Sequence, residues 1–303
     1  MPLLSIQDLR VCFKDRQAID GISFQIFPKK ITALVGQSGS GKSTVALAIV
    51  NLLRKANISG SIILNRKDLL TLGEKDLCKI RGKEIGLIFQ DPGASLNPLH
   101  TVRKQISEAI RIHNPRISKK NLTARIIKLL KMVELESFYS RMSDYPHQFS
   151  GGQKQRIMIA IALANDPKIL IADEPTTALD ATVQNDILNL ILRLKDELGI
   201  AVLLITHDLK VVKKISDKVI VLNEGKIVEQ GDTNQIFLSP QDEYTKLLIS
   251  SSEISQKEEN NVISTKVLSA ENLCVTHKIK KGILKKENFY ANKNIDLSLN
   301  LGQ

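Results

Sequence analysis

The segment from Ile31 to Val50 reads ITALVGQSGSGKSTVALAIV, and it joins a short apolar run, a glycine-rich loop and a helical pattern. The loop, Gly36–Ser43, fits G-x-x-x-x-G-K-[ST]. Its glycines let successive backbone N–H groups face inward, and the start of the following helix adds positive potential. We therefore predict a phosphate-binding loop (P-loop). The alternative, a plain Gly/Ser-rich turn before a helix, does not account for the strand that precedes it.

Two side chains of this loop have predicted roles of their own. Lys42 would neutralise the β- and γ-phosphates of a nucleotide, and Ser43 would supply an oxygen to Mg²⁺. The residues predicted to contact the nucleotide in this stretch are Gly36, Gln37, Ser38, Gly39, Ser40, Gly41, Lys42, Ser43 and Thr44.

A second chemical stretch is ILIADEP, Ile169–Pro175, which places two carboxylates at the end of an apolar run. Ligands bind at the C-terminal ends of the strands in a doubly wound sheet. Asp173 is predicted to hold Mg²⁺, directly or through water, and Glu174 to orient or deprotonate an attacking water. Taken alone, Asp-Glu at a strand end could equally be a solvated turn, but the P-loop earlier in the chain favours the catalytic interpretation.

A third stretch, DYPHQFSGGQKQR from Asp144 to Arg156, opens a helix with Ser150, Gly151, Gly152 and Gln153. A serine followed by two glycines exposes amide donors and a hydroxyl at a helix start, which suits a second phosphate-binding surface. An ordinary N-cap with glycines is the alternative for this pattern in isolation.

The chain up to about residue 248 reads as one alternating α/β unit. The runs ITALVG, KILIAD (from Lys168) and AVLLIT (from Ala201) predict strands of a parallel sheet covered on both faces. VIVLNEGKIVEQG, from Val219, predicts two strands around a tight turn at Glu224-Gly225. Residues from about 92 to 165 are predicted to be a helical insertion, because TARIIKLLKMVEL has the spacing of a helix with Ile126, Leu129, Leu130 and Val133 on one buried face.

The end of the chain repeats its beginning. Residues 249–266 are polar and Ser/Glu/Lys-rich, which predicts a flexible linker. After the linker, LSAENLCV (Leu268–Val275) matches LSIQDLRV (Leu4–Val11), and NIDLSLNLGQ aligns with the segment that begins at Gly21. We expect residues 267–303 to be the N-terminal fragment of a second domain that lacks its P-loop. We also expect this fragment to be poorly ordered, because its strands lack their sheet.

Composition narrows the functional classes. The longest apolar run, IMIAIALA (Ile157–Ala164), is far shorter than the ~18 residues that span a bilayer. We therefore expect a chain that does not cross a membrane by itself, and no secretory signal is visible in its first residues. The net charge of +11 favours polyanionic partners, but the absence of Trp argues against stacking platforms for single-stranded nucleic acid.

Together, SGGQ between a P-loop and a Walker-B-like Asp-Glu resembles the nucleotide-binding domain of ABC transporters. The other family elements follow in order. Gln90 resembles the Q-loop residue, which is catalytic and a Mg²⁺ ligand, and Ala178-Leu179-Asp180 resembles the D-loop. His207 resembles the catalytic switch histidine, and Phe13 the aromatic that stacks on adenine. The resemblance implies an α/β P-loop NTPase fold with an antiparallel β subdomain and a helical insertion, and ATP and Mg²⁺ as ligands.

Narrower similarities concern a subfamily. FQDPGASLNPLHTV, DYPHQFSGGQKQR and LSPQDEYTKLL resemble the dipeptide, oligopeptide and nickel importer ATPases, although Phe149 replaces a usual leucine and the cysteine-rich C-terminal stretch of several members is absent. The linker and HKIKKGILKK, from His277, resemble the fused double-ATPase of the Yej type, linked with import of peptides and microcin C.

This resemblance implies an ATPase subunit at the cytoplasmic face of the inner membrane that energises peptide uptake. Its implied partners are two integral membrane permease subunits, a second nucleotide-binding domain whose SGGQ helix caps the ATP, and, indirectly, a periplasmic substrate-binding protein. Nucleic acid is not among them. Two alternatives stay open: a soluble ABC-type ATPase acting on nucleic acid or ribosomes, and an inactive fragment of a split gene.

Overall fold

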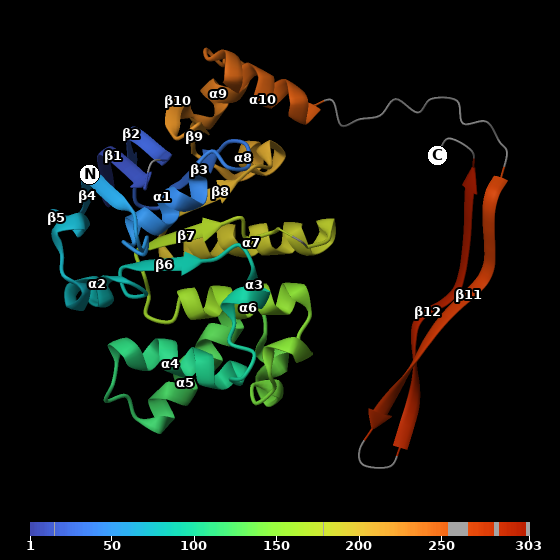
Figure 1. Ribbon diagram of the computed structural model, residues 1–303. Helices are drawn as coiled ribbons and strands as arrows, with labels where there is room; N and C mark the ends of the chain where they lie inside the picture. Colours follow the sequence, from blue (N-terminus) through green and yellow to red (C-terminus); the bar gives the residue numbers. More distant parts are fainter. Residues whose placement is uncertain (15, 178, 254–265, 282–284, 301–303) are drawn as a thin grey trace. The chain divides into compact units, whose positions relative to one another are not determined.

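The computed structural model describes residues 1–14, 16–177, 179–253, 266–281 and 285–300. The chain divides into two compact units, Met1–Ser252 and Glu253–Gln303, which are described separately below. Figure 1 shows the chain coloured from its N-terminus to its C-terminus.

A six-stranded sheet in the order β10-β9-β3-β8-β7-β6 forms the centre of the first unit. All neighbouring strands are parallel except β10, which is antiparallel to β9. Every residue of β3, β7 and β8 is buried, which confirms the prediction that these apolar runs are strands covered on both faces. The strands are β3 (Ile31–Val35), β6 (Ile85–Ile88), β7 (Ile169–Asp173), β8 (Ala201–Thr206), β9 (Lys218–Asn223) and β10 (Lys226–Asp232).

The turn between β9 and β10 confirms the predicted hairpin. Glu224 and Gly225 both have positive φ, of 46° and 77°, as expected for a two-residue turn between twisted antiparallel strands. A Cβ on Gly225 would lie 2.5 Å from the carbonyl oxygen of Ala18. Only glycine fits there. The β9–β10 turn therefore lies directly against the backbone of Ala18, near the N-terminus of the chain.

A second, antiparallel sheet has the order β2-β1-β4-β5. Its apolar face, including Leu4, Leu9 and Ile22, belongs to the same buried cluster as Val45 and Ile49 of helix α1 (Lys42–Ile49). The antiparallel sheet therefore packs over the helix that follows the P-loop. The strands are β1 (Leu4–Phe13), β2 (Arg16–Ile26), β4 (Asn57–Leu64) and β5 (Lys67–Asp68).

Four helices and two short 3-10 turns occupy residues 92–162, within the region predicted as a helical insertion. Figure 1 shows α4 and α5 on the side of α6 that faces away from β6. Leu122, Ile126, Leu129 and Leu130 of α5 are buried, which confirms the predicted apolar face. The elements are α3 (Pro92–Ser95), α4 (Val102–His113), α5 (Lys119–Met132), the 3-10 turns Glu136–Arg141 and Pro146–Gln148, and α6 (Gly151–Ala162).

Most of the remaining helices connect strands of the two sheets, and α9 and α10 follow the last of these strands, β10. Within the described parts of the chain, no helix has the length and apolar character needed to cross a bilayer. These helices are α1 (Lys42–Ile49), the 3-10 turn Leu69–Thr71, α2 (Glu74–Ile80), α7 (Ala181–Leu198), α8 (Leu209–Ile215), α9 (Thr233–Leu238) and α10 (Glu243–Glu253).

The first residues of the predicted linker are helical. Residues 249–253 are the last part of α10, because Leu248 and Ile249 pack against a buried cluster that includes Val35 and Val212. This packing overrides the loop-like composition of the serine-rich segment. Residues 254–265 of the predicted linker lie outside the described residues, and its last residue, Lys266, is the first residue of β11.

The second unit is an antiparallel hairpin of β11 (Lys266–Lys281) and β12 (Lys285–Asn300). The two strands pair with each other, and our expectation that this fragment is poorly ordered stays a prediction. Their register reproduces that of β1 with β2. The equivalent pairs are Leu4–Ile26 and Leu268–Leu299, Ser5–Gln25 and Ser269–Ser298, Ile6–Phe24 and Ala270–Leu297, Leu9–Ile22 and Leu273–Ile295, and Val11–Ile19 and Val275–Asn292.

The irregularities of the two hairpins coincide as well. Asp8 has a φ of 44° and its N–H donates to the Ser23 hydroxyl at 2.9 Å. At the equivalent place Asn272 has a φ of 53° and its N–H donates to the Asp296 carboxylate at 2.8 Å. The repeat therefore extends from sequence to bulge geometry.

The two hairpins differ in what covers their apolar faces. Leu4, Leu9 and Ile22 are at most 1% exposed, whereas their equivalents Leu268, Leu273 and Ile295 are 40–51% exposed. Within the described residues, the second hairpin therefore exposes apolar side chains whose equivalents in the first sheet are buried.

Candidate active site

The P-loop begins where β3 ends, and its glycines are required by close contacts. A Cβ on Gly36 would lie 2.1 Å from the carbonyl oxygen of Leu222, in β9. Gly41, with a φ of 107°, precedes the first residue of α1 and would bring a Cβ within 2.9 Å of the Ala18 carbonyl oxygen. The loop is therefore threaded between β9 and the start of β2, and the N-terminus of α1 faces the resulting space.

Lys42 lies across the loop. Its side chain is buried, and its Nζ donates to the carbonyl oxygens of Gly36 and Gln37 at 2.9 and 2.8 Å. Burial lowers the pKa of Lys42, while the nearby carboxylates of Glu174 and Asp173 oppose this change. Within the described part of the chain, the hydrogen-bond partners of this buried ammonium group are carbonyl oxygens, so it offers a strong interaction to an incoming anion.

The P-loop borders a cavity of about 680 Å³. Nine of the predicted site residues line it: Phe13, Ser38, Gly39, Gly41, Lys42, Ser43, Thr44, Gln90 and Glu174. It is also lined by residues that were not predicted to belong to the site: Arg16, Gln17, Ala18 and the predicted turn residues Glu224 and Gly225. The cavity therefore unites the P-loop, the Walker-B-like end of β7 and the first two strands.

Glu174 is held by three side chains. Its Oε2 accepts hydrogen bonds from Gln90 Nε2 at 3.0 Å and Thr177 Oγ1 at 2.8 Å. Its Oε1 lies 3.0 Å from His207 Nδ1. The residue has a φ of 45°, which is uncommon for a side chain of this size and indicates a conformation fixed by its surroundings.

The charge state of Glu174 follows from these contacts. Burial opposes its ionisation, but the hydrogen bonds from Thr177 and His207, and the charges of His207 and Lys42, outweigh it, so the pKa of Glu174 is lowered. The carboxylate can therefore accept a proton at neutral pH. The structure thus brings together Gln90, Glu174 and His207, which the sequence analysis predicted as catalytic.

Asp173, the residue before Glu174, is suited to a cation. Its side chain is buried, and its Oδ1 has no hydrogen-bond partner among the residues that the structure describes. Burial raises the pKa of Asp173, and a hydrogen bond with Ser43 opposes this change. Mg²⁺ is usually bound by one or two carboxylates together with substrate phosphates. A lone buried carboxylate beside the P-loop serine therefore fits Mg²⁺.

The other predicted phosphate-binding stretch lies elsewhere. Ser150 caps α6, accepting a hydrogen bond from the Gln153 N–H, and the Gln153 side chain accepts one from the Ser150 N–H. Asp180 caps α7 by accepting from the Val183 N–H at 3.0 Å. A Cβ on Gly152 would lie 2.6 Å from Val183 Cγ1, so the SGGQ and Asp180 segments adjoin. Neither these residues nor Gly151 line the P-loop cavity; Ala178 is outside the described residues.

Three P-loop residues that were predicted to bind the nucleotide do not line the cavity: Gly36, Gln37 and Ser40. Ser40 donates its N–H to the Gln37 carbonyl oxygen and accepts from the Gly225 N–H. These bonds tie the loop to the β9–β10 turn.

Residues 19–177 match the family model described as ABC transporter, which covers more than half of the chain. The chain belongs to the ABC transporter family. Among relatives, it is 43% identical over 311 residues to the peptidoglycan transport ATP-binding protein YejF of Agrobacterium fabrum, covering all of this chain and 57% of that protein. It is 45% identical over 255 residues to a candidate peptide import ATP-binding protein of Brucella melitensis, covering 82% of this chain and 76% of the relative.

Solved structures agree with this assignment. The chain superposes on cbiO1 of Clostridium perfringens, part of the ABC transporter complex cbiONQ, with a TM-score of 0.70 and 30% identity, covering 84% of this chain and 96% of that one. A dimeric ATP-binding cassette in a post-hydrolysis state with ADP and phosphate gives a TM-score of 0.68 at 31% identity, covering 76% and 98%. The chain spans 57% and 42% of the first curated relatives, YejF and the oligopeptide transport protein OppD of Mycobacterium bovis.

An apolar cleft of about 240 Å³ lies next to the Gln90 segment of this ABC protein. It includes Leu52, Phe89 and Ile112, which are 41%, 41% and 70% exposed. The cleft is bordered by β6 on one side and by α4 and α6 of the helical region on the other. Phe89 immediately precedes Gln90, so a contact in this cleft lies one residue from a side chain that holds Glu174.

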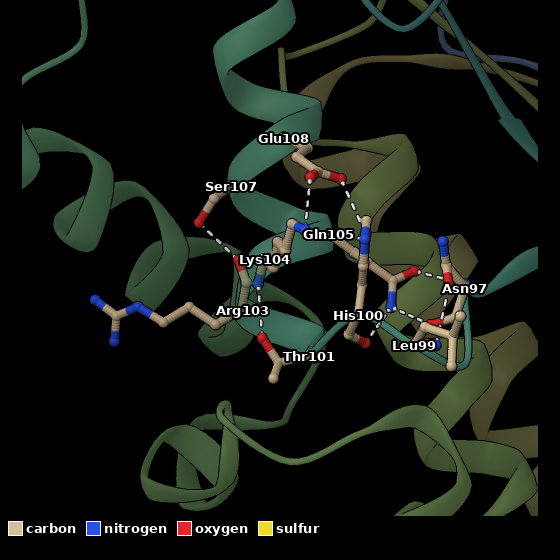
Figure 2. A network of polar contacts seen from close by, with 9 residues as sticks. All are labelled: Asn97, Leu99, His100, Thr101, Arg103, Lys104, Gln105, Ser107 and Glu108. Atoms are coloured by element: carbon tan, nitrogen blue, oxygen red, sulfur yellow. Dashed lines mark hydrogen bonds and ion pairs between the residues drawn. The ribbon is translucent and has the colours of Figure 1, made fainter.

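The loop that joins α3 to α4 is also fixed by side chains, as Figure 2 shows. Gln105 accepts from the Asn97 N–H at 2.9 Å and donates to the carbonyl oxygens of Asn97 and His100. Leu99 donates its N–H to the Asn97 side chain, and its own side chain is 82% exposed. These hydrogen bonds fix the SLNPLHTV loop, which therefore presents a leucine at the surface of the helical region.

Some functional contacts had no sequence signal. Thr177 bonds Glu174 from a turn three residues further on. Arg16, the first residue of β2, and Glu224, in the β9–β10 turn, line the cavity. A turn residue becomes part of a site only through tertiary packing, so no local pattern distinguishes it.

Proposed function

We propose that this chain is the ATP-binding and ATP-hydrolysing subunit of an ABC importer that takes up peptides. The observation that carries the proposal is the clamped carboxylate of Glu174 at the edge of the P-loop cavity, held by Gln90 and His207. A general base fixed beside a phosphate-binding loop is suited to activating water for phosphoryl transfer.

The residues have distinct roles toward ATP. The P-loop amides and Lys42 bind the phosphates, and Phe13, at the end of β1, packs against the adenine. Mg²⁺, held by Ser43, Gln90 and Asp173, would neutralise phosphate charge. Glu174 accepts the proton of the attacking water, while Gln90 and His207 keep its carboxylate aimed at the cavity.

We further propose that the SGGQ helix start and Asp180 act on the nucleotide of a second nucleotide-binding domain. Their position outside the P-loop cavity of their own chain supports this role. Ser150, Gly151, Gly152 and Gln153 would then cap ATP held by the partner's P-loop, and the partner's equivalent residues would complete the site described here.

The apolar cleft beside Phe89 is the proposed docking site for a cytoplasmic segment of an integral membrane permease subunit, with one such subunit for each of the two domains. Exposed apolar side chains gathered in a cleft favour a protein partner. Movement of that segment would reach Glu174 through Phe89 and Gln90.

Replacing Ile112 by aspartate should abolish this docking, since a partner would have to bury an unpaired carboxylate. We expect recovery of the permease subunits with the affinity-tagged variant to fall about tenfold or more. ATP binding by the isolated variant should stay normal because Ile112 does not line the P-loop cavity.

Ile127→Asp is the matched control, because Ile127 is also exposed, lies on α5 and does not line the cleft. If Ile112→Asp and Ile127→Asp reduce the recovery of permease subunits equally, the proposed docking site is wrong.

The cargo and location rest on the relatives. YejF and OppD are named for transport of peptidoglycan and oligopeptides. We propose peptide-containing solutes as cargo, selected by the permeases and, indirectly, by a periplasmic binding protein, with this chain at the cytoplasmic face of the inner membrane.

The deciding experiment is co-purification of the tagged chain with integral membrane subunits from detergent-solubilised membranes, followed by ATPase assay of the complex. We expect both subunits and ATP turnover. Recovery with nucleic acid or ribosomes and without membrane subunits would overturn the importer role, and absence of any turnover would overturn the enzymatic one.

We propose that residues 267–303 begin a second nucleotide-binding domain, since β11 and β12 reproduce the register and bulge of β1 and β2. Among the described residues, those that line the P-loop cavity lie between Phe13 and Gly225. Deleting residues 267–303 should therefore leave ATP affinity unchanged in a titration with a fluorescent ATP analogue. Loss of affinity would show that the hairpin contributes to the first site.

A further inference from the structure

Helix α10 reaches the P-loop from the far end of the first unit. The hydroxyl of Tyr244 accepts a hydrogen bond from the backbone N–H of Gln37 at 3.0 Å. Gln37 is the second residue of the P-loop, and its carbonyl oxygen accepts from Lys42 Nζ and from the Ser40 N–H. Both backbone groups of Gln37 are therefore hydrogen-bonded. Lys42 and Ser40, within the loop, bind its carbonyl oxygen, and Tyr244, outside the loop, binds its N–H.

Contacts outside the P-loop also fix the position of Tyr244. Its ring packs against the buried cluster that contains Val35, the last residue of β3. Its N–H donates to the Asp242 carboxylate at 2.9 Å. The Glu229 carboxylate, in β10, accepts from the N–H groups of Gln241 and Asp242 at 2.9 and 3.1 Å.

We propose that Tyr244 is a positioning residue for the P-loop, resting on the proposed role of this loop in binding ATP. A glycine-rich loop loses conformational entropy when it closes around a ligand. A loop that is ordered beforehand binds more tightly, because less entropy remains to be lost. Tyr244 holds the Gln37 peptide in place before the nucleotide arrives, although Tyr244 does not line the cavity.

The test is Tyr244→Phe, which removes the hydroxyl and keeps the ring in its apolar cluster. Loss of one neutral hydrogen bond corresponds to roughly a three- to tenfold change in affinity. We expect the Kd values of MgATP and MgADP to rise by the same factor within this range, because both nucleotides use the P-loop. The kcat at saturating ATP should stay at the wild-type value, since Glu174 is untouched.

A second measurement reports on the loop itself. In the nucleotide-free protein, amide hydrogen exchange of the peptide that covers residues 36–41 should be faster in Tyr244→Phe than in wild type. A purely structural role would lower the melting temperature without changing this local exchange or the nucleotide Kd. Tyr139→Phe removes the same atom from the helical region, and both readouts should remain at wild-type values there.

The outcomes separate this proposal from the proposed function. If wild type binds MgATP and Tyr244→Phe binds it equally well, the positioning role is wrong, even if exchange of the loop changes. If wild type binds no nucleotide, the proposed function fails. If wild type binds no nucleotide, hydrogen exchange still tests the contact: equal exchange of residues 36–41 in Tyr244→Phe and wild type would show that Tyr244 does not hold the P-loop.

Discussion

Replacing Glu174 by glutamine should lower ATP turnover by about 10²- to 10⁴-fold, the contribution typical of a positioned general base. ATP binding should persist, because glutamine has the size of glutamate. Its amide oxygen can accept from Gln90 and Thr177, and its NH₂ group can face His207 Nδ1 once the imidazole proton moves to Nε2. With ATP bound but not hydrolysed, the variant should accumulate as the closed pair of nucleotide-binding domains.

Three measurements check this prediction: phosphate release, titration with a fluorescent ATP analogue, and the apparent mass of the ATP-bound protein by size-exclusion chromatography. Glu197→Gln removes a carboxylate from the exposed side of α7, where it pairs with Arg193, and serves as the charge-matched control. Near-normal turnover in Glu174→Gln would show that another group activates the water.

Lys42→Ala should reduce ATP affinity by about 100-fold or more. Truncating one partner of a buried, hydrogen-bonded charge pair costs about 2–5 kcal/mol, and each 1.4 kcal/mol is a factor of ten in affinity. The Lys42 side chain is 6% exposed, so water cannot replace it well as a partner for the phosphates. The carbonyl oxygens of Gly36 and Gln37 would also lose their ammonium donor, which loosens the empty loop.

Equilibrium titration with a fluorescent ATP analogue measures this loss directly. Lys128→Ala, on the exposed side of α5, has the same change of charge away from the cavity and should bind normally. A melting temperature near that of wild type would show that Lys42→Ala is folded. Retained affinity in a folded Lys42→Ala protein would move the phosphate site away from the P-loop.

Local sequence patterns predicted the strands in which every side chain is buried. Strands β3, β7 and β8 are buried on both faces, and their continuous apolar runs reveal this without further information. The Glu224-Gly225 turn follows from backbone chemistry, since glycine tolerates a positive φ. The catalytic roles of Gln90 and His207 were predicted through family resemblance, and that of Glu174 also through the strand-end rule of α/β sheets. The contact of these three side chains is a finding of the structure.

Contacts that depend on tertiary packing could not be predicted in this way. Tyr244 lies in a helix 207 residues from Gln37, and nothing in EYTKLL distinguishes an anchoring tyrosine from a core one. The serine-rich residues 249–253 read as linker, yet the packing of Leu248 and Ile249 extends the helix through them.

The place of β3 in the central sheet has a consequence for how the protein is made. β3 pairs with β8 on one side and β9 on the other, so both neighbours come from the last third of the first unit. During synthesis the P-loop strand therefore leaves the ribosome long before either neighbour exists. Non-local parallel pairing of this kind is slow and leaves strand edges exposed while it is incomplete. The growing chain completes its nucleotide site late, and until then β3 depends on protection from aggregation.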